Sequence, residues 1–148
     1  MSSILYTDGQ LFESKKESYI SVVNKNNDIL FFCLIGYKTA RETEGTAILK
    51  ALEYFQENNI LNGTIYTDSL DWAGLANGNH RVSADLKNEG ALNLVNQILT
   101  LKKKLLTTIH WKRREYNLAG HFLAKVWTID KKDRDKILTI LEPPKVDS

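Results

Sequence analysis

The chain has 148 residues, of which 43% are hydrophobic and 26% charged, and its formal net charge is +2. This composition excludes a chain that is disordered throughout and suits one globular domain. The longest apolar run, residues 29–37, is too short for a membrane-spanning helix, and we expect no signal peptide. Cys33 is the only cysteine, so an intrachain disulfide is excluded, and we expect a protein of the reducing cytoplasm.

The first half of the chain predicts three strands followed by a helix. The strands are rich in β-forming residues, are separated by turn signals and should form an antiparallel meander. They cover residues 4–8, 19–23 and 29–37. In the helix, Ile48, Leu52 and Phe55 recur at helical spacing. Glu44 shares that inward face at the first turn, where a carboxylate needs a partner or a metal.

The second half predicts strands that alternate with helices. Ser69 is expected to cap a short helix, and Leu92, Val95 and Leu99 to form the inward face of a longer one. The expected elements are a strand over 64–68, a helix over 69–75, a helix over 83–104, a strand over 105–111 and a helix over 117–127. Because helices separate these later strands, they should run parallel. We expect one domain over residues 1–128 and a polar tail over 129–148 with one short helix at most.

The tripeptide Tyr-Thr-Asp occurs twice, ending at Asp8 and at Asp68. Each Asp is predicted at the carboxyl end of a strand, where α/β sheets form ligand sites. If those strands are neighbours, the two carboxylates converge, and Glu44 completes an all-oxygen cluster. Three such carboxylates raise one another's pKa, and a divalent cation removes the repulsion. Hard oxygen ligands favour Mg²⁺ or Mn²⁺ over zinc.

These motifs, in this order, resemble type 1 ribonuclease H over roughly residues 3–127. The matching segments share the expected elements as well as the residue types. They are Tyr6-Thr7-Asp8-Gly9, Glu42-Thr43-Glu44 with Ala47, Tyr66-Thr67-Asp68-Ser69, and Trp111-Lys112-Arg113-Arg114-Glu115-Tyr116-Asn117 followed by His121, Leu123 and Ala124. The resemblance implies a ribonuclease H-like α/β fold with a five-stranded mixed sheet flanked by helices. The short segment between the two middle helices resembles the form without a basic protrusion.

The resemblance also implies an endonuclease that hydrolyses the RNA strand of RNA–DNA hybrids with two divalent cations, Mg²⁺ or Mn²⁺. Asp8, Glu44 and Asp68 match the family's metal-binding carboxylates, and Asp8 would bridge both ions. His121 stands where the family usually has a fourth Asp. It either binds the second ion as a neutral imidazole, which favours Mn²⁺, or lines the site without binding metal.

Other positions depart from the family pattern. The loop over residues 10–16 does not match the family's Gly-rich loop, and Ala40-Arg41 replace polar amides before the catalytic Glu. The mobile His that many members carry before the last helix is missing, and Arg114 is the nearest candidate for its role. These departures concern contacts to the substrate more than metal binding.

The net charge hides an asymmetry between the two halves. Residues 1–80 carry 6 basic and 10 acidic side chains, whereas residues 81–148 carry 14 and 8. A cluster of cations in the second half is either a solvated face or a footprint for a nucleic-acid backbone. We call this cluster the basic group: Lys102, Lys103, Lys104, Lys112, Arg113 and Arg114. With Asn117, it is our candidate contact to the phosphates of the hybrid.

Two other functions remain open. The altered loop and His121 also suit a catalytically weak nucleic-acid-binding module of the same fold. A junction resolvase is a further alternative, against which the run from Trp111 to Asn117 argues. We expect a monomer, and because resolvases act as dimers, a monomer in solution would count further against it. No P-loop, dinucleotide fingerprint or nucleophile elbow is present. The remaining aromatic residues have structural interpretations: Trp72 and Trp111 are expected in the core, and His80 and His110 at the surface.

Overall fold

The computed structural model describes residues 3–78, 91–126 and 132–133. Its centre is one five-stranded sheet with the strand order β3-β2-β1-β4-β5. The strands are β1 (Ile4–Phe12), β2 (Glu17–Asn24), β3 (Ile29–Leu34), β4 (Thr64–Thr67) and β5 (Thr108–Trp111). β1, β2 and β3 pair antiparallel, whereas β4 runs parallel to both β1 and β5. The predicted mixed sheet, with its meander and its parallel strands, is confirmed.

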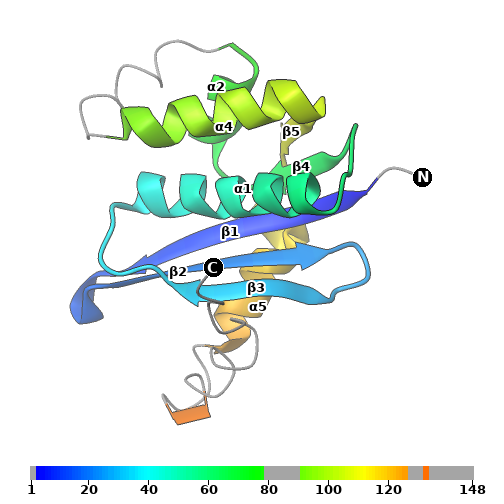
Figure 1. Cartoon of the computed structure of the whole chain (residues 1–148). Helices are drawn as coiled ribbons and strands as arrows, with labels where there is room; N and C mark the ends of the chain where they lie inside the picture. Colours follow the sequence, from blue (N-terminus) through cyan, green and yellow to red (C-terminus); the bar gives the residue numbers. More distant parts are fainter. Residues whose placement is uncertain (1–2, 79–90, 127–131, 134–148) are drawn as a thin grey trace, which may run out of the picture.

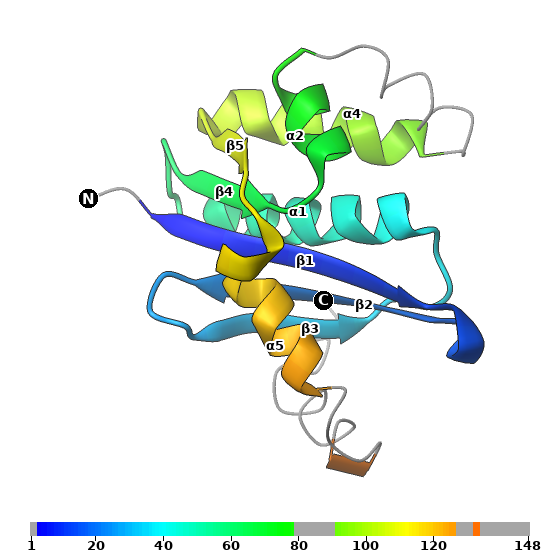
Figure 2. The ribbon, with the colours of Figure 1, turned by 180° about the vertical axis from the view of Figure 1, so that it is seen from behind.

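Helices lie on both sides of this sheet (Figures 1 and 2). One side carries α1 (Ala40–Glu57), α2 (Leu70–Ala76) and α4 (Leu92–Leu105), and the other carries α5 (Leu118–Val126). α1 packs on β1, β2 and β4 and against α4, while α5 packs on β1 and β2. Two single-turn helices complete the described part, η1 (Glu13–Lys15) and η2 (Arg114–Tyr116). No helix in the described ranges is long and apolar enough to span a membrane.

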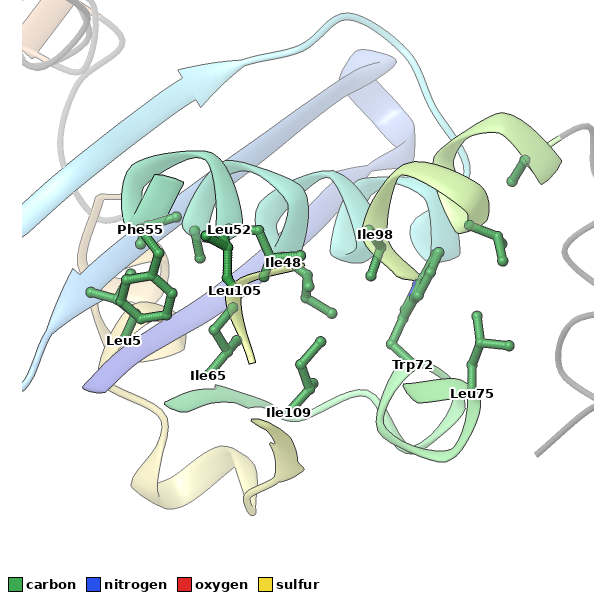
Figure 3. Close-up of a cluster of buried hydrophobic side chains, with 14 residues drawn as sticks. Leu5, Ile48, Leu52, Phe55, Ile65, Trp72, Leu75, Ile98, Leu105 and Ile109 are labelled. Carbon is green, nitrogen blue, oxygen red and sulfur yellow. The ribbon is translucent and has the colours of Figure 1, made fainter. Parts of the chain in front are cut away.

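The main core lies between α1 and the sheet (Figure 3). As predicted, Ile48, Leu52 and Phe55 are fully buried on the inner face of α1. They pack in one cluster with Leu5 of β1 and Ile65 of β4. Burying each side chain of this size contributes about 1.5–3 kcal/mol. This packing fixes the axis of α1, and therefore its polar first turns, relative to the ends of β1 and β4.

α2 is held against the start of α1 by one buried aromatic side chain. Ser69 caps α2 as predicted, because its hydroxyl accepts a hydrogen bond from the Trp72 backbone N–H. Trp72 is 1% exposed, which confirms its predicted core position, and its indole N–H donates to the Arg41 carbonyl at 2.8 Å. A Cβ at Gly45 would lie 2.2 Å from the Trp72 ring. Glycine is therefore required there for this close packing.

Two predicted segments need correction around α4. The helix continues to Leu105, and Leu106 follows in a left-handed conformation with φ 55°, so β5 begins at Thr108 rather than at residue 105. The buried face is Val95, Ile98 and Leu105, whereas Leu92 and Leu99 are exposed. The prediction for Val95 is confirmed, whereas those for Leu92 and Leu99 are wrong, because this helix carries leucine on several faces and spacing alone did not separate them. Residues 83–90 of the predicted helix and His80 lie outside the described residues.

Three further expectations differ from the structure at element ends. β3 ends at Leu34 instead of residue 37, and α1 begins at Ala40, which places Glu44 in the second turn. Trp111 is 44% exposed rather than in the core, because it stands at the last position of the edge strand β5. His110 is exposed, as predicted. The predicted tail over 129–148 lies outside the described residues apart from 132–133.

Candidate active site

Strand register brings the two Tyr-Thr-Asp motifs together. Tyr6 pairs with Tyr66 and Thr7 with Thr67 in the parallel ladder of β1 and β4. Asp8 and Asp68 therefore occupy equivalent positions immediately beyond the paired residues. Asp68 follows the end of β4 as predicted, but Asp8 lies within β1, opposite Ser21 of β2. The prediction that β1 ends at Asp8 was wrong, because its antiparallel pairing with β2 continues to Phe12.

Glu44 reaches the same place because α1 approaches β1 very closely at Gly9. A Cβ at Gly9 would lie 2.5 Å from the carbonyl carbon and oxygen of Thr43 and 2.7 Å from the Glu44 backbone nitrogen. Backbone packs against backbone here, which only glycine permits. Thr39 is the N-cap of α1, because its side chain accepts a hydrogen bond from the Glu42 N–H. The close packing at Gly9 and the N-cap at Thr39 together fix the position of Glu44 beside the two Asp residues.

The three carboxylates form one cluster. Asp8, Glu44 and Asp68 each offer an oxygen atom, and these atoms all lie within 4.8 Å of one another. Burial, together with the charges of Asp68 and Glu44, raises the pKa of Asp8 to about 8. Burial and the charge of Asp68 raise the pKa of Glu44 to about 7. Burial also raises the pKa of Asp68. The fold therefore holds the carboxylates in a place that disfavours their charged forms.

A divalent cation fits this arrangement. The donors are hard oxygen atoms, which Mg²⁺ and Mn²⁺ prefer. Asp68 Oδ2 is buried and has no hydrogen-bond partner among the described residues. A buried carboxylate oxygen without a partner is costly, and a bound cation is one way to satisfy such an atom. A cation at the cluster would satisfy this oxygen and offset the mutual repulsion of all three side chains.

Arg114 supplies a positive charge near the cluster from the protein itself. Its Nε atom lies 3.9 Å from Asp68 Oδ2, which is too long for a hydrogen bond. The Arg114 side chain is 81% exposed, whereas that of Asp68 is 8% exposed. Its charge lowers the pKa of Asp8, Glu44 and Asp68, but burial outweighs it. The guanidinium is therefore a weak, solvent-facing counter-ion at the rim of the site.

Asn117 is a structural residue of the site rather than a surface contact. The side chain is fully buried. Its Nδ2 donates to the Thr7 carbonyl at 2.9 Å, and its Oδ1 accepts from the Ala119 N–H at 3.1 Å. The prediction that Asn117 contacts nucleic acid is therefore wrong in this structure. The residue ties the start of α5 to the strand that carries Asp8.

His121 lies beside the cluster without joining it. Within the described residues, the group of mutually close ligand atoms contains the three carboxylates alone. His121 is exposed and lines a surface hollow of about 320 Å³ together with Asp8, Arg114 and Gly120. A Cβ at Gly120 would lie 3.4 Å from Asp8 Oδ2, so α5 passes close to this carboxylate. His121 therefore faces the same hollow as Asp8 from one turn of α5.

The basic group divides into two parts in the structure. Lys102, Lys103 and Lys104 lie in the last turn of α4, before β5 begins. Lys112, Arg113 and Arg114 follow the other end of β5, on the side of Asp68. A four-residue strand separates the parts by about 13 Å. The basic group therefore lies at the two ends of β5, and Arg114 of its second part borders the carboxylates.

Sequence reasoning missed the structural role of Gly9. The first strand was predicted to end at Asp8, whereas Asp8 and Gly9 both lie inside β1. A glycine within a strand can indicate a close approach of another backbone, which is the signal that was available. Trp111 was also missed at the rim of the site, where its indole N–H donates to the Asp68 carbonyl at 3.3 Å.

The comparisons with known proteins identify the family. A family model described as reverse transcriptase-like matches residues 7–126. Because this match covers most of the chain, the chain belongs to that reverse transcriptase-like family. No curated protein shows a significant sequence match.

Solved structures share the fold at low sequence identity. LC11-RNase H1, isolated from compost by a metagenomic approach, is 21% identical with a TM-score of 0.65, over 93% of this chain and 99% of that one. The N-terminal RNase H domain of a Mycobacterium tuberculosis protein is 16% identical with a TM-score of 0.62, over 83% of this chain and 95% of that one. A foamy viral protease-reverse transcriptase, solved in complex with an RNA/DNA hybrid, is 20% identical with a TM-score of 0.61. The match covers 83% of this chain and 19% of that one.

Proposed function

We propose that the chain is a divalent-cation-dependent endonuclease that hydrolyses the RNA strand of RNA–DNA hybrids. The cluster of Asp8, Glu44 and Asp68 carries this proposal, because its oxygen atoms converge within 4.8 Å and include a buried atom without a partner. The family match supports it, as does the likeness to LC11-RNase H1, which was also solved in complex with an RNA/DNA hybrid.

The proposed chemistry needs no nucleophile from the protein. Bound divalent cations supply activation of a water molecule for in-line attack and stabilisation of the leaving 3′-oxygen. Asp8, Glu44 and Asp68 would hold them, since these side chains offer the only grouped ligand atoms in the described ranges. Arg114 stands at the rim and is free to attract a backbone phosphate with its exposed guanidinium. The products would be an RNA 5′-phosphate and an RNA 3′-hydroxyl.

His121 is the proposed additional ligand to a second cation. It lines the hollow that Asp8 borders, and the sequence resemblance implies that it stands at the position of the family's fourth Asp. Imidazole suits Mn²⁺ better than Mg²⁺. We therefore expect higher turnover with Mn²⁺, and we expect His121→Ala to raise the Mn²⁺ concentration for half-maximal activity by about tenfold. Equal or better turnover in Mg²⁺ would contradict the preference, and an unchanged Mn²⁺ dependence in the variant would contradict the ligand.

A catalytically weak binding module is the second candidate function. It is favoured by one observation, that the exposed His121 stands outside the carboxylate cluster. Incubation of a labelled hybrid with Mg²⁺ and with Mn²⁺ in parallel separates the two functions. Cleavage that disappears in Asp8→Asn supports the nuclease, whereas binding of the hybrid without cleavage in either metal supports the module.

A further inference from the structure

Three rings lie side by side across β1, β4 and β5. Tyr6 pairs with Tyr66 in the register of β1 and β4, and Tyr66 pairs with His110 in that of β4 and β5. The Tyr6 and Tyr66 rings stack with centroids 5.4 Å apart and an interplanar angle of 30°. The Tyr66 and His110 rings are 6.2 Å apart at 39°. We call Tyr6, Tyr66 and His110 the aromatic row.

The aromatic row lies on the sheet face away from α1. The side chains that pack under α1, such as Leu5, Ile65 and Ile109, stand at the alternate positions of the same strands. On the side of the aromatic row, α5 lies over β1 and β2, and no helix of the described residues covers β4 (Figure 2). His110 is exposed, and the two tyrosines are half-buried. The row is thus partly open to solvent.

Lys112 places a positive charge over the aromatic row. Its Nζ atom lies 4.4 Å from the centroid of Tyr66 and 5.3 Å from that of Tyr6. The Lys112 backbone N–H donates to the Thr67 carbonyl at 2.8 Å, so the residue is fixed to the end of β4. On this face, the other side chains of β4 and β5 are the neutral Thr64 and Thr108, whose hydroxyls lie 3.3 Å apart. The face therefore combines rings with a cation and has no acid before Asp68.

The position of the aromatic row relative to the carboxylates limits what can occupy it. Tyr6 and Tyr66 precede Asp8 and Asp68 by two residues on the same strands, a distance of about 6.6 Å. Rings of this kind hold nucleic acid by stacking on the flat faces of the bases. Bases inside a duplex have both faces covered by their neighbours. Only a single-stranded segment offers bases that can reach the row.

We propose that the aromatic row and Lys112 form a binding surface for single-stranded nucleic acid, next to the carboxylate cluster and separate from it. A base stacks on Tyr66 and His110 and takes the place of the Lys112 ammonium, which moves to the adjoining phosphate. Stacking accepts any base, so the surface selects unpaired strand rather than sequence. This binding requires no divalent cation and no hydrolysis. The binding test can therefore succeed or fail whether or not the chain is a nuclease.

The test is binding of a short fluorescent oligothymidylate by the full chain in EDTA, measured by polarisation. Tyr66→Leu, His110→Ala and Lys112→Ala should each weaken binding by about fivefold or more, because a stacked ring or a phosphate contact is lost. Tyr66→Phe keeps the ring and should bind as the unmodified chain does. His110→Ala is an exposed change, so it tests the surface even if Tyr66→Leu fails to fold.

Matched controls lie on the other side of the sheet. Lys50→Ala removes one charge from α1, and Tyr54→Leu removes one ring from the same helix; both should change binding by less than twofold. Absence of oligothymidylate binding by the unmodified chain would overturn the proposal. So would Tyr66→Leu, His110→Ala and Lys112→Ala variants that all bind as tightly as the unmodified chain. If the unmodified chain forms a dimer, and the Tyr66, His110 and Lys112 variants lose that dimer but still bind oligothymidylate, the surface serves self-association instead.

Discussion

Replacing Asp8 with Asn should make the metal-free protein more stable while it abolishes hydrolysis. Asp8 is 9% exposed and lies within a cluster of three carboxylates. The amide keeps the size of the side chain but carries no charge. At a pH where Asp8 is ionised, the substitution removes a buried charge and its repulsion of Asp68 and Glu44. A residue that the fold tolerates at a cost in stability is expected at a functional site.

The magnitude follows from the pKa of Asp8, which is raised from 3.8 to about 8. At 1.36 kcal/mol per pH unit, this difference corresponds to about 5 kcal/mol at pH 8. We expect about half of it, roughly 2–3 kcal/mol, because the neighbouring carboxylates share protons and the site relaxes. For a domain of this size, such a gain raises Tm by about 5–10 °C.

The assay is urea and thermal unfolding at pH 8 in EDTA, with hybrid cleavage measured on the same samples. Glu53→Gln, an acid-to-amide change on α1 away from the cluster, is the matched control and should alter stability by less than about 0.5 kcal/mol. An Asp8→Asn protein that is less stable than the unmodified chain in EDTA would refute the reasoning. So would a gain no larger than that of the control.

Three other expectations concern pH, packing and charge. The pKa values of Asp8 and Glu44 in the folded chain are about 8 and about 7, above their ordinary values of 3.8 and 4.5. The metal-free chain should therefore lose stability as pH rises from about 4 to 8, because the folded state binds more protons than the unfolded state. Mg²⁺ or Mn²⁺ at pH 8 should restore the stability, and a flat stability profile in EDTA would contradict this. Gly9→Ala should cost about 2–4 kcal/mol in urea unfolding, because its Cβ would meet the Thr43 backbone at 2.5 Å, and a loss under 0.5 kcal/mol would count against the packing. Lys103→Ala combined with Arg113→Ala should reduce the slope of log affinity for the hybrid against log salt by up to about 2, whereas a salt-independent affinity would refute the phosphate contacts.

Much of the fold was predictable from local pattern. The spacing of Ile48, Leu52 and Phe55 identified the buried face of α1, and alternation placed each Tyr of the repeated Tyr-Thr-Asp motif on the same face as its Asp. The convergence of Asp8 with Asp68 was conditional on their strands being neighbours, and the register shows that they are. These features depend on residues close in sequence or on a simple rule of topology.

The errors arose where distant parts of the chain decide the outcome. β1 continues past Gly9 because β2 pairs with it, and α1 needs that glycine for its close approach. The burial of Asn117 depends on the Thr7 carbonyl, 110 residues earlier. The basic group is contiguous in composition, but β5 separates its two halves in space. Sequence spacing carries no information on such tertiary contacts.

The central claim is tested most directly by cleavage of an end-labelled RNA–DNA hybrid, compared with single-stranded RNA, duplex RNA and duplex DNA. The account predicts that, with a divalent cation, only the hybrid's RNA strand is cut, that its products carry 5′-phosphates, and that EDTA or Asp8→Asn abolishes the reaction. Cleavage that persists in Asp8→Asn or in EDTA, or cleavage of the DNA strand instead, would contradict it.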